Sequence, residues 1–111
     1  MGWLTVAEAM THLPGPANER FAELFKHGSL SIEIYAPRGV DPQSPHTRDE
    51  VYIVVQGQGA FINGAKRHPF GPGDFLFVPA GVEHRFMDFT DDLVVWVLFY
   101  GPEGGEMPGE G

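Results

Sequence analysis

Two stretches of the chain decide the fold: GVDPQSPHTRDEVYIVVQG, residues 39–57, and GDFLFVPAGVEHRFMD, residues 73–88. Each contains side chains that can bind metal. Each also contains an apolar run with the residue types of a β-strand. In the first stretch, His46 and Glu50 are an even number of residues apart, so they point to the same face if the chain between them is extended. In the second, His84 begins a strand directly after a rigid Pro-Ala-Gly turn that can aim it inward. The two stretches therefore predict strands that bring these three side chains to one place.

The chain on either side of these stretches is also rich in β-forming residues. From Phe21 onward, short runs of this kind are separated by Gly, Pro, Asp and Asn, which is typical of an all-β sandwich or barrel. Two dipeptides, His27-Gly28 and Asn63-Gly64, each place Gly where a tight hairpin needs a positive φ. We therefore expect consecutive strands to pair antiparallel. The predicted strands cover residues 20–26, 29–36, 51–56, 59–63, 66–69, 75–78, 84–89 and 93–100.

The N-terminal residues carry a helix signal. Thr5 and Glu8 make a Thr-x-x-Glu capping box, and apolar residues recur at helical spacing as far as Leu13. A Pro-Gly-Pro sequence then stops the pattern, so the sequence predicts a helix over residues 5–13.

The length of 111 residues allows a single domain over residues 1–111. Within it we expect the barrel to cover residues 20–100. The tail, residues 101–111, is rich in Gly, Glu and Pro, has little to bury, and is expected to be flexible.

Composition excludes several classes of function. The net charge of −8 repels phosphate backbones, and the seven Lys and Arg residues form no basic run, so nucleic acid is not an expected partner. No apolar run approaches the ~20 residues of a membrane helix, so a membrane partner is excluded as well. The N-terminus lacks the pattern of a secretory signal, and we expect a cytoplasmic protein. The chain has no cysteine, so any metal must be bound by nitrogen and oxygen atoms.

Two imidazoles and a carboxylate form a ligand set that leaves several coordination positions of a metal open, which is what a catalytic metal needs. His46, Glu50 and His84 are therefore the candidate metal ligands. Their nitrogen and oxygen atoms suit one divalent transition metal, namely Fe, Mn, Ni, Co, Zn or Cu.

The two stretches resemble the two motifs of the cupin superfamily. The first motif is a glycine, His-x-His, a glutamate three or four residues on, then six residues and a glycine. The second is Gly-x5-Pro-x-Gly-x2-His-x3-Asn. The positions in this chain that match are Gly39, His46, Glu50 and Gly57 in the first, and Gly73, Pro79, Gly81 and His84 in the second, with Asp88 at the last place. The resemblance implies an all-β fold, a cupin double-stranded β-helix or jelly-roll barrel with a short N-terminal helix, of the small single-domain metal-binding type.

One important position departs from the family pattern. Ser44 stands where the family usually has its first metal histidine. The longer amide of Gln43 is a candidate fourth ligand, if Pro42 and Pro45 force a bulge that re-aims it. The alternative is that His46 and its two partners form a hydrogen-bonded cluster in a barrel without metal.

Strand parity predicts the wall of a pocket. Tyr52, Val54 and Phe86 alternate with the candidate ligands and should face inward, where a small barrel has room for one small ligand. Arg48 and Asp49 are expected to form a solvated pair, although Arg48 could hold a carboxylate at the mouth.

The resemblance implies a metal-dependent enzyme acting on a small organic molecule, of dioxygenase, isomerase or lyase type, and no residue selects among these reactions. The alternatives are a non-catalytic module that binds a small ligand or metal, and a storage or structural barrel.

A homodimer is also expected. Residues 51–55 and 93–100 are apolar at every position, so both faces of these strands need a cover. The alternative is that the N-terminal helix and the segment after Pro37 supply that cover within a monomer.

Overall fold

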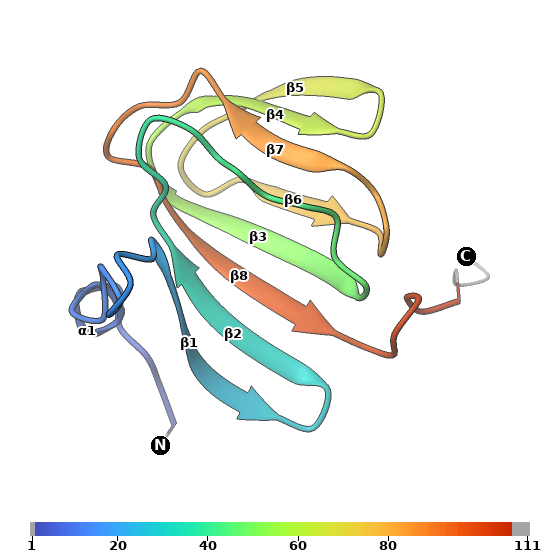
Figure 1. The fold of residues 1–111 in the computed structure, drawn as a ribbon, viewed down its shortest axis with the longest axis horizontal. Helices are drawn as coiled ribbons and strands as arrows, with labels where there is room; N and C mark the ends of the chain where they lie inside the picture. The colour runs from blue at the N-terminus through green and yellow to red at the C-terminus, as the bar shows by residue number, and fades with distance from the viewer. Residues whose placement is uncertain (1, 108–111) are drawn as a thin grey trace.

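The computed structural model of the chain describes residues 2–107 and arranges their strands in two antiparallel sheets, with a short helix at one side (Figure 1). The five-stranded sheet has the order β1-β2-β8-β3-β6 and the three-stranded sheet the order β5-β4-β7. This all-β arrangement confirms the expected fold class. The strands are β1 (Phe21–His27), β2 (Leu30–Tyr35), β3 (Asp49–Gln56), β4 (Gly59–Asn63), β5 (Lys66–Phe70), β6 (Phe75–Val78), β7 (His84–Met87) and β8 (Val94–Tyr100).

All of the predicted strands are present, with ends that agree within two residues. The two predicted hairpins join β1 to β2 and β4 to β5, and Gly28 and Gly64 have φ values of 59° and 62°. The expected pairing of consecutive strands is wrong elsewhere, because β8 lies between β2 and β3, and β7 pairs with β4. The reason is that the chain passes from one sheet to the other after β3, β5, β6 and β7, so that strands distant in the sequence become neighbours.

The core lies between the two sheets and is dominated by aromatic side chains. Tyr52 on β3 is fully buried and packs edge-on against Phe61 of β4 and Phe86 of β7, with ring centroids 5.6 and 5.0 Å apart. Since β3 belongs to one sheet and β4 and β7 to the other, this cluster fixes the distance between the sheets. Edge-to-face aromatic pairs of this kind contribute about 0.5–1.5 kcal/mol beyond their burial.

The helix α1 (Val6–Met10) packs on the outer face of the larger sheet. Ala9 is buried there against Ile34 and Val94. The Thr5 hydroxyl caps the helix by accepting the Glu8 amide at 3.1 Å. The helix is shorter than the predicted 5–13, because the amides of residues 12 and 13 bond three residues back rather than four, which tightens the last turn.

The segment after β8 is tied to the barrel as far as it is described. The Gly104 amide donates to Thr47 O at 2.7 Å, and the Glu106 amide donates to Asp49 Oδ2 at 2.8 Å. Asp49 Oδ1 accepts the Ala80 amide at 2.9 Å, so one carboxylate joins this segment to β3 and to the turn before β7. The expectation of a flexible tail stays a prediction, and its residues 108–111 lie outside the described residues.

No helix within residues 2–107 is long and apolar enough to cross a membrane.

Candidate metal centre

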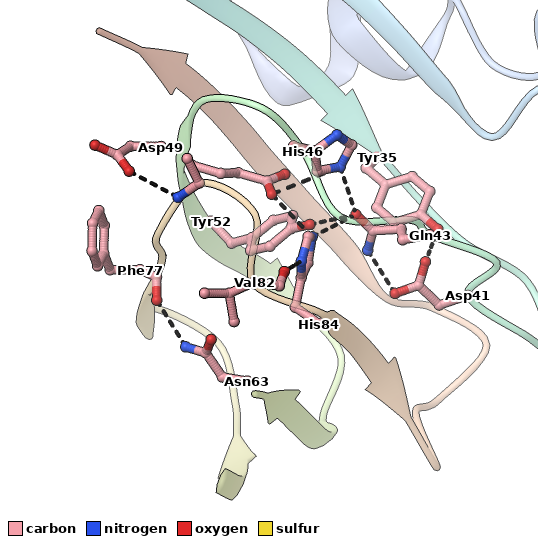
Figure 2. Close-up of polar contacts among 12 residues, drawn as sticks. Tyr35, Asp41, Gln43, His46, Asp49, Tyr52, Asn63, Phe77, Val82 and His84 are labelled. Atoms are coloured by element: carbon pink, nitrogen blue, oxygen red, sulfur yellow. Dashed lines mark hydrogen bonds and ion pairs between the residues drawn. The ribbon is translucent and has the colours of Figure 1, made fainter. Parts of the chain in front are cut away.

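Three elements bring the candidate ligands together. Glu50 is the second residue of β3, His46 lies in the loop before that strand, and His84 is the first residue of β7 in the opposite sheet. One donor atom from each lies within 4.8 Å of the others. Figure 2 shows the rings of His46 and His84 on either side of the Gln43 amide. Glu50 Oε1 is 3.0 Å from His84 Nε2 and 3.8 Å from His46 Nε2. Spacing in the sequence thus identified side chains that converge.

The cluster is buried on one side and open on the other. Glu50 and His84 are almost fully buried, whereas the side chain of His46 is 37% exposed. The His46 ring is held by an edge-on contact with Phe99 at 4.9 Å between centroids. A ligand would therefore reach the centre from the side of His46.

Hydrogen bonding fixes which atom of His84 carries a proton. His84 Nδ1 lies 2.9 Å from Val82 O, and a carbonyl can only accept, so Nδ1 donates. In the neutral ring Nε2 then has a lone pair, and it faces Glu50 Oε1, a buried oxygen that has no hydrogen-bond partner among the described residues. Two lone pairs at this distance repel each other unless a proton or a metal cation lies between them.

The pKa of His84 is shifted by the same negatively charged surroundings. Burial disfavours the charged ring, but the hydrogen bond that a protonated Nε2 would donate to Glu50, the bond to Val82 O and the charges of Glu50 and Asp41 outweigh it and raise the pKa above its ordinary value. The cluster therefore attracts positive charge.

Gln43 adds a further acceptor. Its Oε1 is 3.2 Å from His84 Nε2 and 3.5 Å from His46 Nε2, and it accepts the Tyr52 hydroxyl at 2.6 Å. Its Nε2 donates to Asp41 Oδ2 at 2.6 Å. Because a carboxylate only accepts, the amide nitrogen must face Asp41, and the oxygen must face the histidines.

Asp41 was missed by the sequence analysis. It is buried, and its carboxylate accepts the Tyr35 hydroxyl and the Phe86 amide (2.8 Å) as well as the Gln43 amide. These donors hold the carboxylate still, so Asp41 positions the Gln43 oxygen. The signal in the sequence was weak, since an Asp before Pro usually marks a turn.

A cavity of about 540 Å³ opens beside the cluster. Gln43, His46 and Glu50 form one end of it, and Val97 and Phe99 contribute apolar wall. Its other charged residues, which were not predicted from the sequence, are Arg20, Glu33 and Arg38.

The residues expected to line the pocket are placed differently. Tyr52, Val54 and Phe86 do face inward, but they are buried in the core between the sheets and do not border the cavity. The alternation of side chains along a strand identified the face to which these residues point. It could not show whether they border the cavity or lie deeper in the core. Arg48 and Asp49 are not a solvated pair, because Arg48 Nε donates to Gly101 O at 3.0 Å and Asp49 accepts backbone amides.

Residues 31–100 match the family model of the cupin domain. The chain belongs to the cupin family. A cupin 2 conserved barrel domain protein from Salinispora arenicola superposes with a TM-score of 0.68 at 19% identity, covering 91% of this chain and 89% of that one, which is a likeness of fold.

Two curated proteins are similar to this cupin in sequence. An uncharacterized protein of Streptomyces coelicolor is 36% identical over 85 residues, 75% of this chain and 81% of that protein. An acireductone dioxygenase of Rhodopseudomonas palustris is 42% identical over 45 residues, 37% of this chain. The match covers only 27% of that enzyme.

This cupin keeps the motif spacing and departs from the motif residues at Ser44 and Asp88. Ser44, at the place of the usual first histidine, is exposed. The neighbouring Gln43 turns its amide oxygen to the cluster instead (Figure 2). The structure thus places Gln43 where the sequence suggested it could reach.

Proposed function

We propose that this cupin binds one divalent transition metal ion through His46, Glu50 and His84, with the amide oxygen of Gln43 as a fourth ligand. The observation that supports this most is the convergence of two imidazole nitrogens, the Glu50 oxygen and the Gln43 amide oxygen on one partly buried place. A single proton on His84 Nε2 can satisfy only part of that set, whereas a cation satisfies all of it. Imidazole nitrogen with carboxylate and amide oxygen suits Fe, Mn, Ni, Co, Zn or Cu.

We further propose that the centre serves an enzyme of dioxygenase, isomerase or lyase type acting on a small organic molecule. A bound ion would supply a Lewis-acid or oxygen-activating centre. Similarity of part of the chain to an acireductone dioxygenase supports this class of reaction. The small cavity beside His46 supports a small substrate.

The chain's own residues would handle protons in that cavity. Burial, together with the charges of Glu23 and Glu50, raises the pKa of Glu33 to about 7, so Glu33 can accept or give a proton near neutral pH. Tyr52 is unsuited to that task, because burial and nearby carboxylates raise its pKa well above the ordinary value and its hydroxyl donates to Gln43.

Elemental analysis tests the metal proposal. We expect protein purified without added metal or chelator to retain close to one metal ion per chain. His84→Ala should retain less than about a tenth of that amount, since it removes a buried ligand, and Gln43→Leu should weaken metal affinity about 10-fold.

Two variants serve as controls. His27→Ala, at the exposed β1–β2 hairpin, and Ser44→Ala should retain metal like the wild type. Wild-type protein with less than a tenth of a metal ion per chain, or equal retention in wild type and His84→Ala, would count against the proposal. Stoichiometric ligand binding without product formation would indicate a binding module rather than an enzyme.

We also propose a homodimer formed through the outer face of the larger sheet. The helix covers only the part of this face around Ile34 and Trp96. Phe75 and Phe77 on β6 remain 63% and 40% exposed beside Val51 and Ile53 of β3. A second copy of this apolar surface is the simplest cover for it.

A further inference from the structure

The end of the cavity formed by Arg20 and Arg38 carries two positive charges that point to a ligand. Both residues line the cavity, Arg20 from the start of β1 and Arg38 from the loop after β2. Arg20 Nε donates to Ala36 O at 2.8 Å, and Arg38 Nη1 donates to the same oxygen at 3.4 Å. One backbone carbonyl therefore holds two guanidinium groups side by side.

This juxtaposition is unfavourable in itself. Burial and the charge of Arg38 lower the pKa of Arg20. The chain has 15 Asp and Glu residues against seven Lys and Arg, yet no carboxylate among residues 2–107 forms an ion pair with either guanidinium. Like charges held together in a partly enclosed place favour an anion that neutralises both.

The donors that remain suit a carboxylate. The terminal nitrogens of Arg20 make no hydrogen bond within the described residues, and Arg38 Nη2 is equally unused. A guanidinium presents such N–H groups as a planar fork that matches the two oxygens of a carboxylate. An ammonium would be repelled by them, and a neutral acceptor would gain hydrogen bonds without the attraction between opposite charges.

The remaining walls define the rest of the ligand. Val97 and Phe99 are apolar, Glu33 adds a carboxyl group, and the acceptor cluster around Glu50 borders the same cavity. A ligand that fills the cavity therefore has an anionic end, a short apolar body, and an oxygen atom at the end that faces the cluster.

We propose that Arg20 and Arg38 form a carboxylate-binding subsite, and that the substrate class of this cupin is a small organic carboxylate with a second oxygen function. The substrate assignment rests on the proposed function, since it takes the acceptor cluster that borders the cavity as the metal centre. The subsite itself rests only on the two guanidinium groups and can be tested without metal.

Calorimetric titration of the full chain at low ionic strength tests the subsite. The probes are benzoate, salicylate and acetate, each compared with its neutral amide, and inorganic phosphate, in chelator-treated and in metal-loaded protein. We expect at least one carboxylate to bind about 10-fold or more tightly than its amide in both preparations. Phosphate binding as tightly as the best carboxylate would overturn the assignment to an organic anion.

Variants locate the binding. Arg38→Gln and the double variant Arg20→Gln/Arg38→Gln should weaken carboxylate binding about 10-fold and 100-fold and leave amide binding unchanged. Arg85→Gln, an exposed arginine on β7 outside the cavity, is the matched control and should bind like the wild type. Arg38 is itself exposed, so its variant keeps the test valid if the double variant fails to fold.

Three results would overturn the proposal: equal binding of acids and amides, no carboxylate binding at all, or wild-type affinity in Arg38→Gln and the double variant. Failure of the metal centre gives a different result. In that case the chelator-treated and metal-loaded proteins would bind carboxylates alike, and the arginine variants would still lose affinity.

Discussion

Glu33 lies on β2 with its side chain toward the cavity, and burial is the main cause of its raised pKa. Two further carboxylates raise the pKa to about 7: that of Glu23, which is paired with Glu33 from the neighbouring strand β1, and that of Glu50 on β3. The ordinary value is 4.5, so between these two pH values the folded chain binds a proton that the unfolded chain releases. This contribution therefore stabilises the fold at low pH and is lost as the pH rises through about 7.

Glu33→Gln should remove this pH dependence. In chelator-treated protein, we expect the wild type to lose about 1–2 kcal/mol more unfolding free energy than the variant between pH 4.5 and pH 8, after allowance for partial solvent screening. Urea unfolding followed by tryptophan fluorescence measures the difference. Glu83→Gln, at an exposed position, is the control. Parallel curves for wild type and Glu33→Gln would contradict the assignment.

The candidate ligands could be predicted from the sequence, but the residues around them could not. His46, Glu50 and His84 stand at spacings set by local strand and turn geometry, which a sequence displays directly. Asp41 and the two arginines act through contacts with residues far along the chain or with a backbone carbonyl. Such contacts arise only when residues 36–48 fold over the end of the barrel, and no local pattern encodes that path.

At the scale of elements, Gly57 fixes how β3 leaves the sheet. Its φ is 94°, and a Cβ at this position would lie 2.6 Å from Leu93 Cα, a backbone atom that cannot move aside. The close approach lets the chain after β3 pass beside the start of β8, its neighbour in the sheet. Gly28 at the β1–β2 hairpin also has a positive φ but has open space around it.

Gly57→Ala should therefore destabilise the fold more than Gly28→Ala. We expect losses of about 2–4 kcal/mol and about 1 kcal/mol respectively, because only the first adds a backbone clash to the cost of a left-handed conformation. Urea unfolding of both variants at one pH provides the comparison. Equal losses would show that the contact with Leu93 is not what restricts this position.

The strands and the two hairpin turns could be predicted from the sequence, but the order of the strands in the sheets could not. Runs of β-forming residues predicted each strand, and Gly in the two hairpins predicted their turns, since these are local properties. The neighbours of β8 are β2 and β3, and the hydrophobic pattern of β8 would suit any buried position in a sheet. Pairing over such separations depends on the whole fold and cannot be read from one strand.

At the scale of the whole molecule, the larger sheet has one face toward the core and one face that the helix covers in part. The apolar run of β8 reflects this, because Val95 and Val97 fill the core while Val94 packs beneath the helix. On β6 two phenylalanines, Phe75 and Phe77, stay exposed. Residues of the segment after Pro37 line the cavity.

Replacing Phe75 and Phe77 together by Ser should convert the proposed dimer into a monomer at about 10 μM, since it removes the most exposed apolar area of the proposed interface. Sedimentation velocity measures the change. Val40→Ser, an exposed apolar residue at the cavity, is the control and should leave the dimer intact. A wild-type chain that sediments as a monomer at this concentration would remove the dimer proposal.

The carboxylate of Asp49 gives the C-terminal segment an importance that its Gly-rich composition hides. One of its oxygens holds Glu106 and the other holds Ala80, four residues before His84. An affinity tag that replaced the residues after Tyr100 would remove the Glu106 amide as a donor to Asp49. It would thereby loosen the turn at Ala80, which orients His84 at the start of β7. For this reason residues 101–106 should be kept in any version of the chain in which metal binding is measured.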